Sequence, residues 1–307
     1  MKVLVTFAVD RKFQKIGNEI LGKENIIWYP DLEPAEILLV RDNNFPYSEE
    51  VKFIQTITAG VDHINFSRIK KSTVVASNAG AYSVSVAEHA LALLLSAAKS
   101  IVKKDLEIKN GIFNPEETIL LNGKTILIIG YGGIGSKFAR LAKSFNMKVI
   151  AIGRSYRDDY ADEFYDLDKL KDLVKLADFI LISVPLNRQT YGMIDRNVLE
   201  LSKKRAIWVN VARPEILKRD DLISFLKQRS DVVYSTDVWW DEPNVKVPIM
   251  DNLIITPHTA GGRSGEVMEN AYREAFLNVK RFMEGDKPKN IVNIDEVIWI
   301  DRGSLGV

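Results

Sequence analysis

The chain has 307 residues, 46% of them hydrophobic, and its 42 basic and 41 acidic side chains almost cancel. This length favours two domains, and the balanced charge excludes a general attraction to nucleic acid or to an anionic membrane. The absence of cysteine excludes disulfides and thiolate metal sites, and the start MKVLVTFAVD lacks the features of a signal peptide, so we expect a soluble cytoplasmic protein without a metal.

Short apolar runs alternate with short helical patterns in the first part of the chain. Such β-branched runs are typical of buried parallel strands. They predict a small doubly wound α/β domain of the flavodoxin-like kind. The runs are KVLVTF from Lys2, ENIIWY from Glu24, EILLV from Glu36, FIQTIT from Phe53 and TVVAS from Thr73.

A helical pattern without glycine or proline runs from about Ser85 to Ile108 and predicts a single helix that joins two domains. A second amphipathic pattern, Glu266–Met283, is expected to return the chain to the first domain. We therefore predict a discontinuous substrate domain, 1–85 with 264–307, and a cofactor domain, 86–263, with a cleft between them.

The cofactor domain repeats the strand and helix alternation on a larger scale. Alternation of this kind predicts a doubly wound parallel sheet, whose ligand binds beyond the carboxyl ends of the strands. The expected crossover helices are Gly133–Phe145, Leu167–Leu176, Arg196–Leu201 and Glu215–Gln228. The expected strands are TILIIG from Thr125, KVIAI from Lys148, FILIS from Phe179, AIWVN from Ala206, VVYSTDV from Val232 and NLIIT from Asn252.

A glycine-rich turn, GYGGIG, follows the strand at Thr125 and opens a helix. Its glycines have the spacing of the dinucleotide fingerprint, which permits a tight turn and a close approach of backbone amides to a pyrophosphate. The strand before it and the helix after it make the fingerprint specific. We predict cofactor contacts at Gly130, Gly132, Gly133, Ile134 and Gly135.

The end of the next strand indicates which cofactor is used. An NAD enzyme normally places a carboxylate there, against the ribose 2′-hydroxyl, but this chain has Arg154, Ser155 and Arg157. Arginine and serine suit a 2′-phosphate, so NADP(H) is preferred and NAD(H) remains possible. The alternative is a solvated basic loop, because Asp158 and Asp159 follow closely.

Three charged side chains leave the ligand edge of the predicted sheet on different strands. They are Arg213, Glu242 and His258. An arginine can clamp a carboxylate, and a histidine held by a glutamate can pass a proton to a developing alkoxide. With a nicotinamide as hydride source, these groups predict reduction of a 2-oxo acid.

These motifs give the chain a strong resemblance to the D-isomer-specific 2-hydroxyacid dehydrogenase family, over nearly its whole length. The family includes glyoxylate/hydroxypyruvate reductases and phosphoglycerate dehydrogenases. The ordered motifs are Ala59-Gly60-Val61-Asp62, Asn78 with Val86-Ala87-Glu88-His89, the glycine turn, Val184-Pro185-Leu186 with Thr190, Asn210-Val211-Ala212-Arg213, Asp237 with Glu242-Pro243, and Thr256-Pro257-His258.

The resemblance implies a role for each matching residue. Arg213 would bind the substrate carboxylate and polarise the 2-oxo group, His258 would be the acid/base, and Glu242 would orient it and favour its cation. The backbone of Ala59, Gly60 and Val61 would also meet the substrate, and two chains would pair through the cofactor domain. Further cofactor contacts are implied for Val184, Pro185, Thr190, Val211, Ala212, Asp237, His258 and Gly261.

One departure from the family pattern and two alternatives accompany this interpretation. Pro214 replaces the glycine common after the arginine, and Glu242, rather than glutamine, argues against the formate dehydrogenase branch. We expect glyoxylate or hydroxypyruvate as substrate. An NAD-linked phosphoglycerate dehydrogenase is the enzyme alternative, and an inactive dinucleotide-sensing corepressor is the alternative of another class.

Several other residues near the motifs have an ordinary structural explanation. We expect His89 to pack within an apolar helix and His63 to be a packed or surface histidine. Arg41 is expected to be exposed, although it follows a strand and can reach the substrate. Trp239 and Trp240 are equally well explained as pocket walls and as packing.

Overall fold

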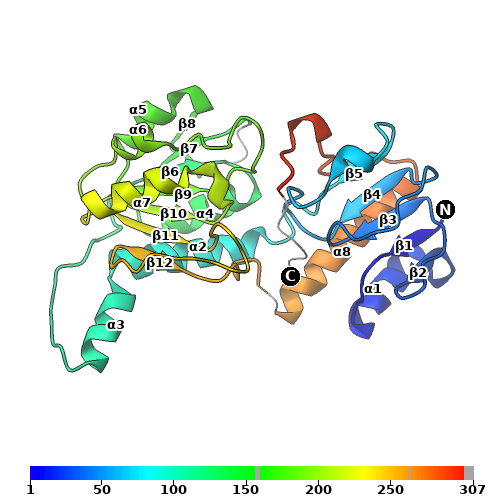
Figure 1. Ribbon diagram of the computed structural model, residues 1–307, viewed down its shortest axis with the longest axis horizontal. Helices are drawn as coiled ribbons and strands as arrows, with labels where there is room; N and C mark the ends of the chain where they lie inside the picture. The colour runs from blue at the N-terminus through cyan, green and yellow to red at the C-terminus, as the bar shows by residue number, and fades with distance from the viewer. Residues whose placement is uncertain (156–159, 263, 301–307) are drawn as a thin grey trace. The chain divides into compact units, whose positions relative to one another are not determined.

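The structure is a computed structural model that describes residues 1–155, 160–262 and 264–300. It divides into two compact units (Figure 1), one of Met1–Tyr82 with Gly262–Val307 and the other of Ser83–Gly261. The second unit begins with helix α2 (Ser83–Ala98). Residues 83–85 therefore belong to this unit and not to the expected substrate domain. Gly262 belongs to the first unit.

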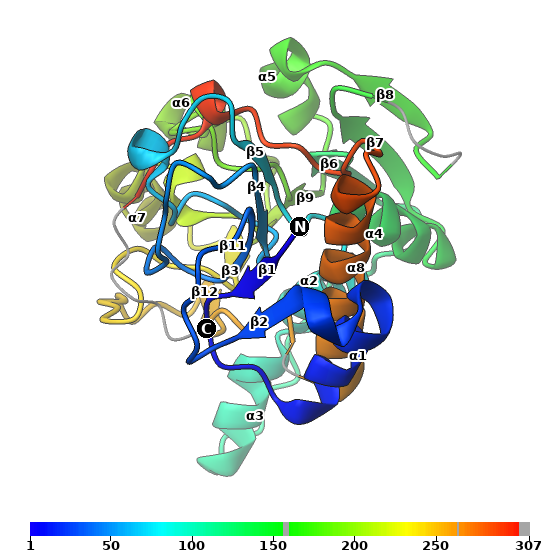
Figure 2. The same ribbon diagram turned by 90° about the vertical axis from the view of Figure 1, so that its right-hand side faces the viewer.

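The first unit contains a five-stranded sheet in the order β2-β1-β3-β4-β5 (Figure 2), and its neighbouring strands are parallel. This is the flavodoxin-like order. Helices α1 (Arg11–Leu21) and α8 (Gly265–Met283) pack against each other, and α8 also packs on β4. The strands are β1 (Val3–Val5), β2 (Ile26–Trp28), β3 (Ile37–Val40), β4 (Phe53–Thr56) and β5 (Val74–Ala76).

Both faces of this sheet are buried, because successive side chains of a strand point to opposite faces. Val3 and Val5 belong to the core that α1 and α8 cover, together with Phe276. Leu4 belongs to the core on the other face, against which Val292 of the C-terminal tail packs. The tail is tied to the sheet edge by a hydrogen bond of 2.8 Å from the Val292 amide to the Val75 carbonyl.

The second unit contains a seven-stranded sheet in the order β12-β11-β10-β9-β6-β7-β8, again with parallel neighbours. The winding reverses between β6 and β9, as in a Rossmann fold, and ligands of such sheets bind beyond the carboxyl ends at this point. The two sheets confirm the predicted fold class. The strands are β6 (Thr125–Ile129), β7 (Lys148–Ile152), β8 (Glu163–Tyr165), β9 (Phe179–Ile182), β10 (Ile207–Asn210), β11 (Val233–Thr236) and β12 (Leu253–Ile255).

Helix α2 packs on β10, β11 and α4, and α4 in turn packs on β6 and β7. Each expected crossover segment contains a helix, although the helices are shorter than the segments. The strand β8 has no apolar run and is not predicted by the pattern, because only Phe164 of its three residues is strongly apolar. The remaining helices are α4 (Gly133–Ser144), α5 (Leu170–Val174), α6 (Arg196–Leu199) and α7 (Arg219–Gln228).

The expected continuous helix from Ser85 to Ile108 is wrong. It is two helices, α2 and α3 (Ile101–Lys109), bent by 57° where Ser100 adopts a left-handed φ of 53°. The chain that returns from α3 caps the end of α2, because the Ile119 amide donates to the Ala98 carbonyl at 2.8 Å. Within the described ranges no single helix is long and apolar enough to cross a membrane, whereas this bent pair passes by length and composition.

Candidate active site

Glycine shapes the turn between β6 and α4. Gly130 has a φ of 103°, and a Cβ there would lie 2.6 Å from the Val184 backbone nitrogen. A Cβ at Gly135 would lie 2.1 Å from the Gly130 carbonyl oxygen, so a larger residue at either position must displace backbone. A Cβ at Gly132 would meet nothing within 4 Å, so the turn is open at the N-cap of α4. This cradle fits a dinucleotide pyrophosphate, which the free amides and dipole of a helix N-terminus stabilise.

The loop after β7 begins with Gly153, Arg154 and Ser155, and the last two are exposed. Because β7 lies beside β6 in the sheet, this loop starts at the same edge as the glycine turn. Gly153, Arg154 and Ser155 offer a guanidinium and a hydroxyl but no carboxylate. Arg157 lies outside the described residues.

The loop after β9 is held by one hydroxyl. Thr190, which is buried, donates through Oγ1 to the Pro185 carbonyl at 2.7 Å and accepts the Asn187 amide at 2.9 Å. The Val184 backbone lies directly against Gly130, where a Cβ would meet its nitrogen at 2.6 Å. The implied contact residues Val184, Pro185 and Thr190 therefore belong to a braced loop at the edge of the cofactor turn.

His258 and Glu242 meet at the carboxyl edge of the sheet. The Nδ1 atom of His258 lies 2.7 Å from Oε2 of Glu242, and Oε1 of the same carboxylate accepts the Trp239 amide at 2.7 Å. The Glu242 side chain is 11% exposed and that of His258 is 36% exposed. With Nδ1 held by the carboxylate, Nε2 is the nitrogen that can exchange a proton with a bound molecule.

Arg213 stands at the end of β10, beside β11 in the sheet. The buried Asn210 side chain shapes its turn, because it accepts the Ala212 amide at 2.9 Å and donates to the Arg213 carbonyl at 3.1 Å. Pro214 is the first residue of a short 3-10 helix, where a missing N–H leaves no carbonyl unpaired. Arg213, Glu242 and His258 thus follow three neighbouring strands, β10, β11 and β12.

Asp237 lies under the segment that carries His258. It is 1% exposed, and its carboxylate accepts the amides of Thr259 at 2.9 Å and Ala260 at 2.7 Å. His89, which the sequence assigns to packing, also reaches this carboxylate, with Nε2 at 3.3 Å from Oδ1. Sequence reasoning misses this contact because an apolar helix gives no sign that one of its polar residues faces a loop far along the chain.

Both tryptophans next to Glu242 are placed by packing. Trp239 is 1% exposed and donates through its indole N–H to the Lys246 carbonyl at 3.1 Å. Trp240 is half-buried and contacts it edge to face, with ring centroids 5.0 Å apart. Trp239 is therefore a core residue that supports the Glu242 loop.

The loop after β4 in the first unit carries the expected substrate contacts. Ala59 is exposed, while Gly60 and Val61 are half-buried, and the Thr58 hydroxyl donates to the Gly60 carbonyl at 2.9 Å. His63 lies beside this loop, with Nε2 3.0 Å from the Arg41 carbonyl.

Arg41 is half-buried rather than exposed. Its guanidinium lies over the Phe7 ring at 5.4 Å, and its Nε is buried without a hydrogen-bond partner among the described residues. Arg41 is 3.5 Å from the Asp42 carboxylate, so its charge is compensated locally.

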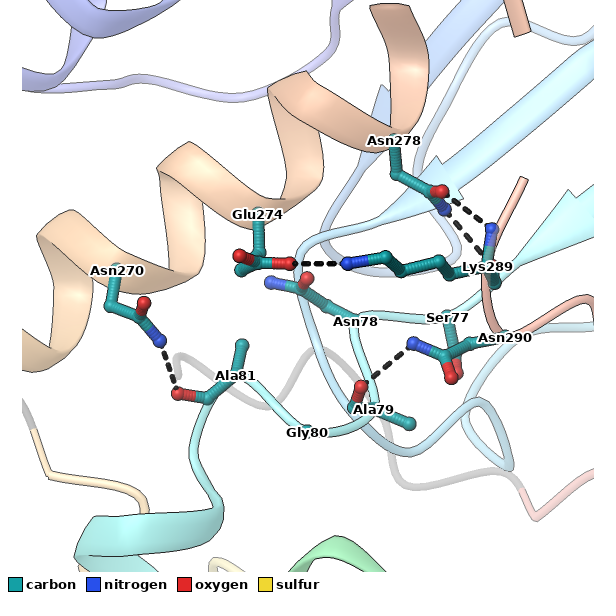
Figure 3. A pocket seen from close by; sticks show the side chains of 10 residues that line it. All are labelled: Ser77, Asn78, Ala79, Gly80, Ala81, Asn270, Glu274, Asn278, Lys289 and Asn290. Carbon is teal, nitrogen blue, oxygen red and sulfur yellow. Dashed lines mark hydrogen bonds and ion pairs between the residues drawn. The ribbon is translucent and has the colours of Figure 1, made fainter. Parts of the chain in front are cut away.

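A polar cavity of about 350 Å³ lies in the first unit, between the segment after β5 and helix α8 (Figure 3). Asn78 is buried there and donates to the carbonyls of Ile57 and Ala271. Asn270 and Asn290 donate to the backbone of the same segment, at the Ala81 and Ala79 carbonyls. The bonds of Asn78 and Asn270 fix the strand exit to α8, and the bond of Asn290 fixes it to the C-terminal tail. None of the residues lining the cavity belongs to the predicted catalytic set. Among the described residues no group of three or more His, Cys, Asp or Glu is arranged to hold a metal ion.

The chain is similar to known proteins over most of its length. Residues 91–260 match the family described as D-isomer specific 2-hydroxyacid dehydrogenase, NAD binding domain. The glyoxylate reductase of Pyrococcus horikoshii is 30% identical over 98% of this chain and 98% of that protein. The D-3-phosphoglycerate dehydrogenase of Methanocaldococcus jannaschii is 30% identical over 99% of this chain, which spans only 62% of that relative.

Among solved structures, the glycerate dehydrogenase related protein of Thermoplasma acidophilum is 44% identical, with a TM-score of 0.69, and the match covers 92% of this chain and 100% of that one. The family match, together with the fold and the glycine cradle, defines an oxidoreductase linked to a nicotinamide dinucleotide. More particularly, the chain belongs to the D-isomer specific 2-hydroxyacid dehydrogenase family, as its motifs indicate.

Proposed function

We propose that this chain reduces a small 2-oxo acid, glyoxylate or hydroxypyruvate, to the D-2-hydroxy acid with NADP(H) as the preferred cofactor. The observation that carries the proposal is the 2.7 Å contact between His258 Nδ1 and Glu242 Oε2. Glu242 follows β11, which neighbours β10, the strand that Arg213 follows. A glyoxylate reductase is among the relatives of similar length.

Each member of this set has a distinct task. Arg213 binds the substrate carboxylate and polarises the neighbouring carbonyl, because a guanidinium offers paired N–H donors to planar oxygen groups. His258 gives the proton from Nε2 to the developing alkoxide, and Glu242 holds the imidazole by Nδ1 and stabilises its cation. The bound nicotinamide supplies the hydride. The amides of the Ala59, Gly60 and Val61 loop are the further contacts that we propose for the substrate.

The cofactor preference rests on the loop after β7. Arg154 and Ser155 are exposed there, where a carboxylate would repel a 2′-phosphate. The remaining contacts that we propose for the cofactor are the turn from Gly130 to Gly135 and residues of the later loops: Val184, Pro185, Thr190, Val211, Ala212, Asp237, His258 and Gly261.

The test is a panel of glyoxylate, hydroxypyruvate, pyruvate and 3-phosphohydroxypyruvate, each assayed with NADPH and NADH. We expect the highest kcat/KM with glyoxylate or hydroxypyruvate, and a preference for NADPH of about tenfold, or about 1.4 kcal/mol. Highest efficiency with 3-phosphohydroxypyruvate and NADH would instead identify a phosphoglycerate dehydrogenase, the activity named for one relative. Turnover of none of the four would favour a dinucleotide sensor.

Changing Arg154 to Asp should weaken NADPH specifically, since the new carboxylate suits a hydroxyl and repels a phosphate. The matched control is Arg140→Asp, which makes the same charge change at an exposed position of α4. An equal loss in both variants would attribute the effect to net charge and contradict the assignment.

We also propose that two copies pair through the second unit. Helix α3 stands away from the sheet (Figure 1) and has no buried residue. Four of its apolar side chains are more than half exposed: Ile101, Val102, Leu106 and Ile108. A nine-residue helix of this kind is marginal in water without a packing partner. The same unit carries a largely apolar cavity of about 460 Å³ between α2 and β12, so an apolar projection and an apolar groove lie on one surface. Such a surface can pair with its own copy about a two-fold axis.

The oligomeric state tests this pairing. By light scattering on a sizing column we expect a dimer for the parent and a monomer for Leu106→Glu, because a buried unpaired carboxylate is costly. Lys175→Glu, an exposed charge reversal elsewhere in the same unit, should leave the dimer intact. A monomeric parent would refute the pairing.

A further inference from the structure

One buried carboxylate supports the segment that carries His258. Asp237 accepts the Thr256 hydroxyl at 2.5 Å and the Thr259 amide at 2.9 Å on Oδ1, and the Ala260 amide at 2.7 Å on Oδ2. These bonds fix residues on both sides of His258, whose φ of 54° lies in the left-handed region. A residue other than glycine keeps such a backbone only when its surroundings impose it.

The side chain of His89 reaches this network from helix α2. Its Nε2 is 2.8 Å from Thr256 Oγ1 and 3.3 Å from Oδ1 of Asp237. Because an ionised carboxylate only accepts hydrogen bonds, Nε2 carries a hydrogen that it donates. The Thr256 hydroxyl has a single hydrogen, so once its oxygen accepts from His89 that hydrogen is available for Asp237. His89 therefore sets the direction of the hydroxyl.

The charge of Asp237 depends on these donors. Burial alone would raise the pKa of its carboxyl, but the bonds from His89, Thr256 and the amides of Ala260 and Thr259 outweigh burial and lower that pKa. The carboxylate consequently stays ionised, and bonds to an ionised acceptor are stronger than those to a neutral one.

We propose that His89 is a positioning residue for proton transfer. It holds the Thr256 hydroxyl on Asp237, and Asp237 holds the backbone that presents His258 to Glu242. The inference rests on the proposed function, because it takes His258 as the proton donor. Reacting groups displaced by about 1 Å can lose on the order of a hundredfold in rate, so the loss of a support behind the proton donor should lower kcat.

Two substitutions separate the hydrogen bond from the packing of the side chain. His89→Leu fills much of the same space without a donor, whereas His89→Gln keeps an amide N–H that can reach Thr256. Ser96→Ala is the matched control, since Ser96 lies on the same helix and lines the same groove as His89, so it also reports any effect of altering the groove proposed for pairing. For 2-oxo acid reduction we expect kcat to fall on the order of tenfold or more in His89→Leu, to recover largely in His89→Gln, and to stay at the parental value in Ser96→Ala. The glycine turn is unaffected in all three, so the dissociation constant of NADPH should change much less than kcat.

Hydrogen exchange supplies a readout that does not require activity. The amides of Thr259 and Ala260 donate to Asp237, so peptides that contain them should exchange faster in His89→Leu than in the parent or in Ser96→Ala. Equal exchange in His89→Leu and the parent would overturn the proposal, and so would a parental kcat in His89→Leu when His258→Ala is inactive. If the parent itself reduces none of the acids, the proposed function has failed. Faster exchange in His89→Leu would then still support the structural link to Asp237.

Discussion

The cofactor turn and the catalytic pair lie along one sheet edge but are built by different means. All glycines of the turn fall between Gly130 and Gly135, and their effect is to keep side chains away. His258 and Glu242 come from two loops, and each is held by groups elsewhere, the Trp239 amide and the Asp237 carboxylate among them. A cradle can thus be specified by a short stretch of sequence, whereas an acid–base pair requires tertiary support.

The largest effect is expected at the pair itself. His258→Ala removes the proposed proton donor, and kcat for reduction should fall by on the order of 10² to 10⁴. NADPH binding, measured by fluorescence titration, should change much less than kcat, because the glycine turn and most other proposed cofactor contacts are unaffected. A variant that retains near-parental kcat would show that the proton comes from another group. The contrast between the cofactor turn and an acid–base pair held by tertiary contacts would then no longer apply.

A smaller effect is expected from Glu242→Gln, which keeps a hydrogen-bond partner 2.7 Å from His258 but removes the charge. The carboxylate compensates the positive charge of a proton-donating imidazole, and the neutral amide does not. We expect kcat for reduction to fall by about tenfold at neutral pH. The measurement is kcat in both directions, beside that of His258→Ala. A parental kcat would mean that Glu242 serves only to orient the imidazole.

Two glycine substitutions distinguish steric shaping of the turn from contact with the ligand. Gly135→Ala puts a methyl group 2.1 Å from the Gly130 carbonyl, and such overpacking costs about 1–3 kcal/mol of folding stability. Gly132→Ala meets nothing within 4 Å, so it should leave the unfolding temperature unchanged while weakening NADPH binding. Thermal unfolding and NADPH titration of both variants test this. Full NADPH affinity in Gly132→Ala would place the pyrophosphate elsewhere.

The smallest effect concerns Asp237, whose pKa is lowered in the folded protein despite its burial, by the bonds from His89, Thr256 and two amides. A carboxyl with a lowered folded pKa contributes stability that is present above its unfolded value of about 3.9 and is lost as pH falls through the lower folded value. Asp237→Asn should therefore lower the unfolding temperature most near neutral pH and by progressively less below about pH 4. An unchanged difference across the acid range would contradict this account.

The sequence predicts the parallel strands because buried strands are rich in apolar and β-branched residues. Each expected apolar run contains a strand. One strand, β8, lies outside the expected runs, because it is an edge strand whose residues are all half-buried. The cofactor turn is also readable, since glycine spacing after a strand is a local property. The expected continuous helix from Ser85 to Ile108 is wrong because its break depends on a residue distant in the chain. The helix breaks at Ser100, and the amide of Ile119 donates to the Ala98 carbonyl at the end of the first helix. A helical pattern in the sequence contains no information about this contact.

By itself the sequence determined the two doubly wound sheets, the glycine cradle and the residue types at the strand ends, because each follows from side chains close together in the chain. Only the tertiary structure decided how those strand ends are supported. His89 and Thr256 are 167 residues apart in the chain, and no local pattern indicates that they meet over Asp237. The reason is physical: a buried carboxylate must find its donors wherever the fold brings them, and the fold is a property of the whole chain.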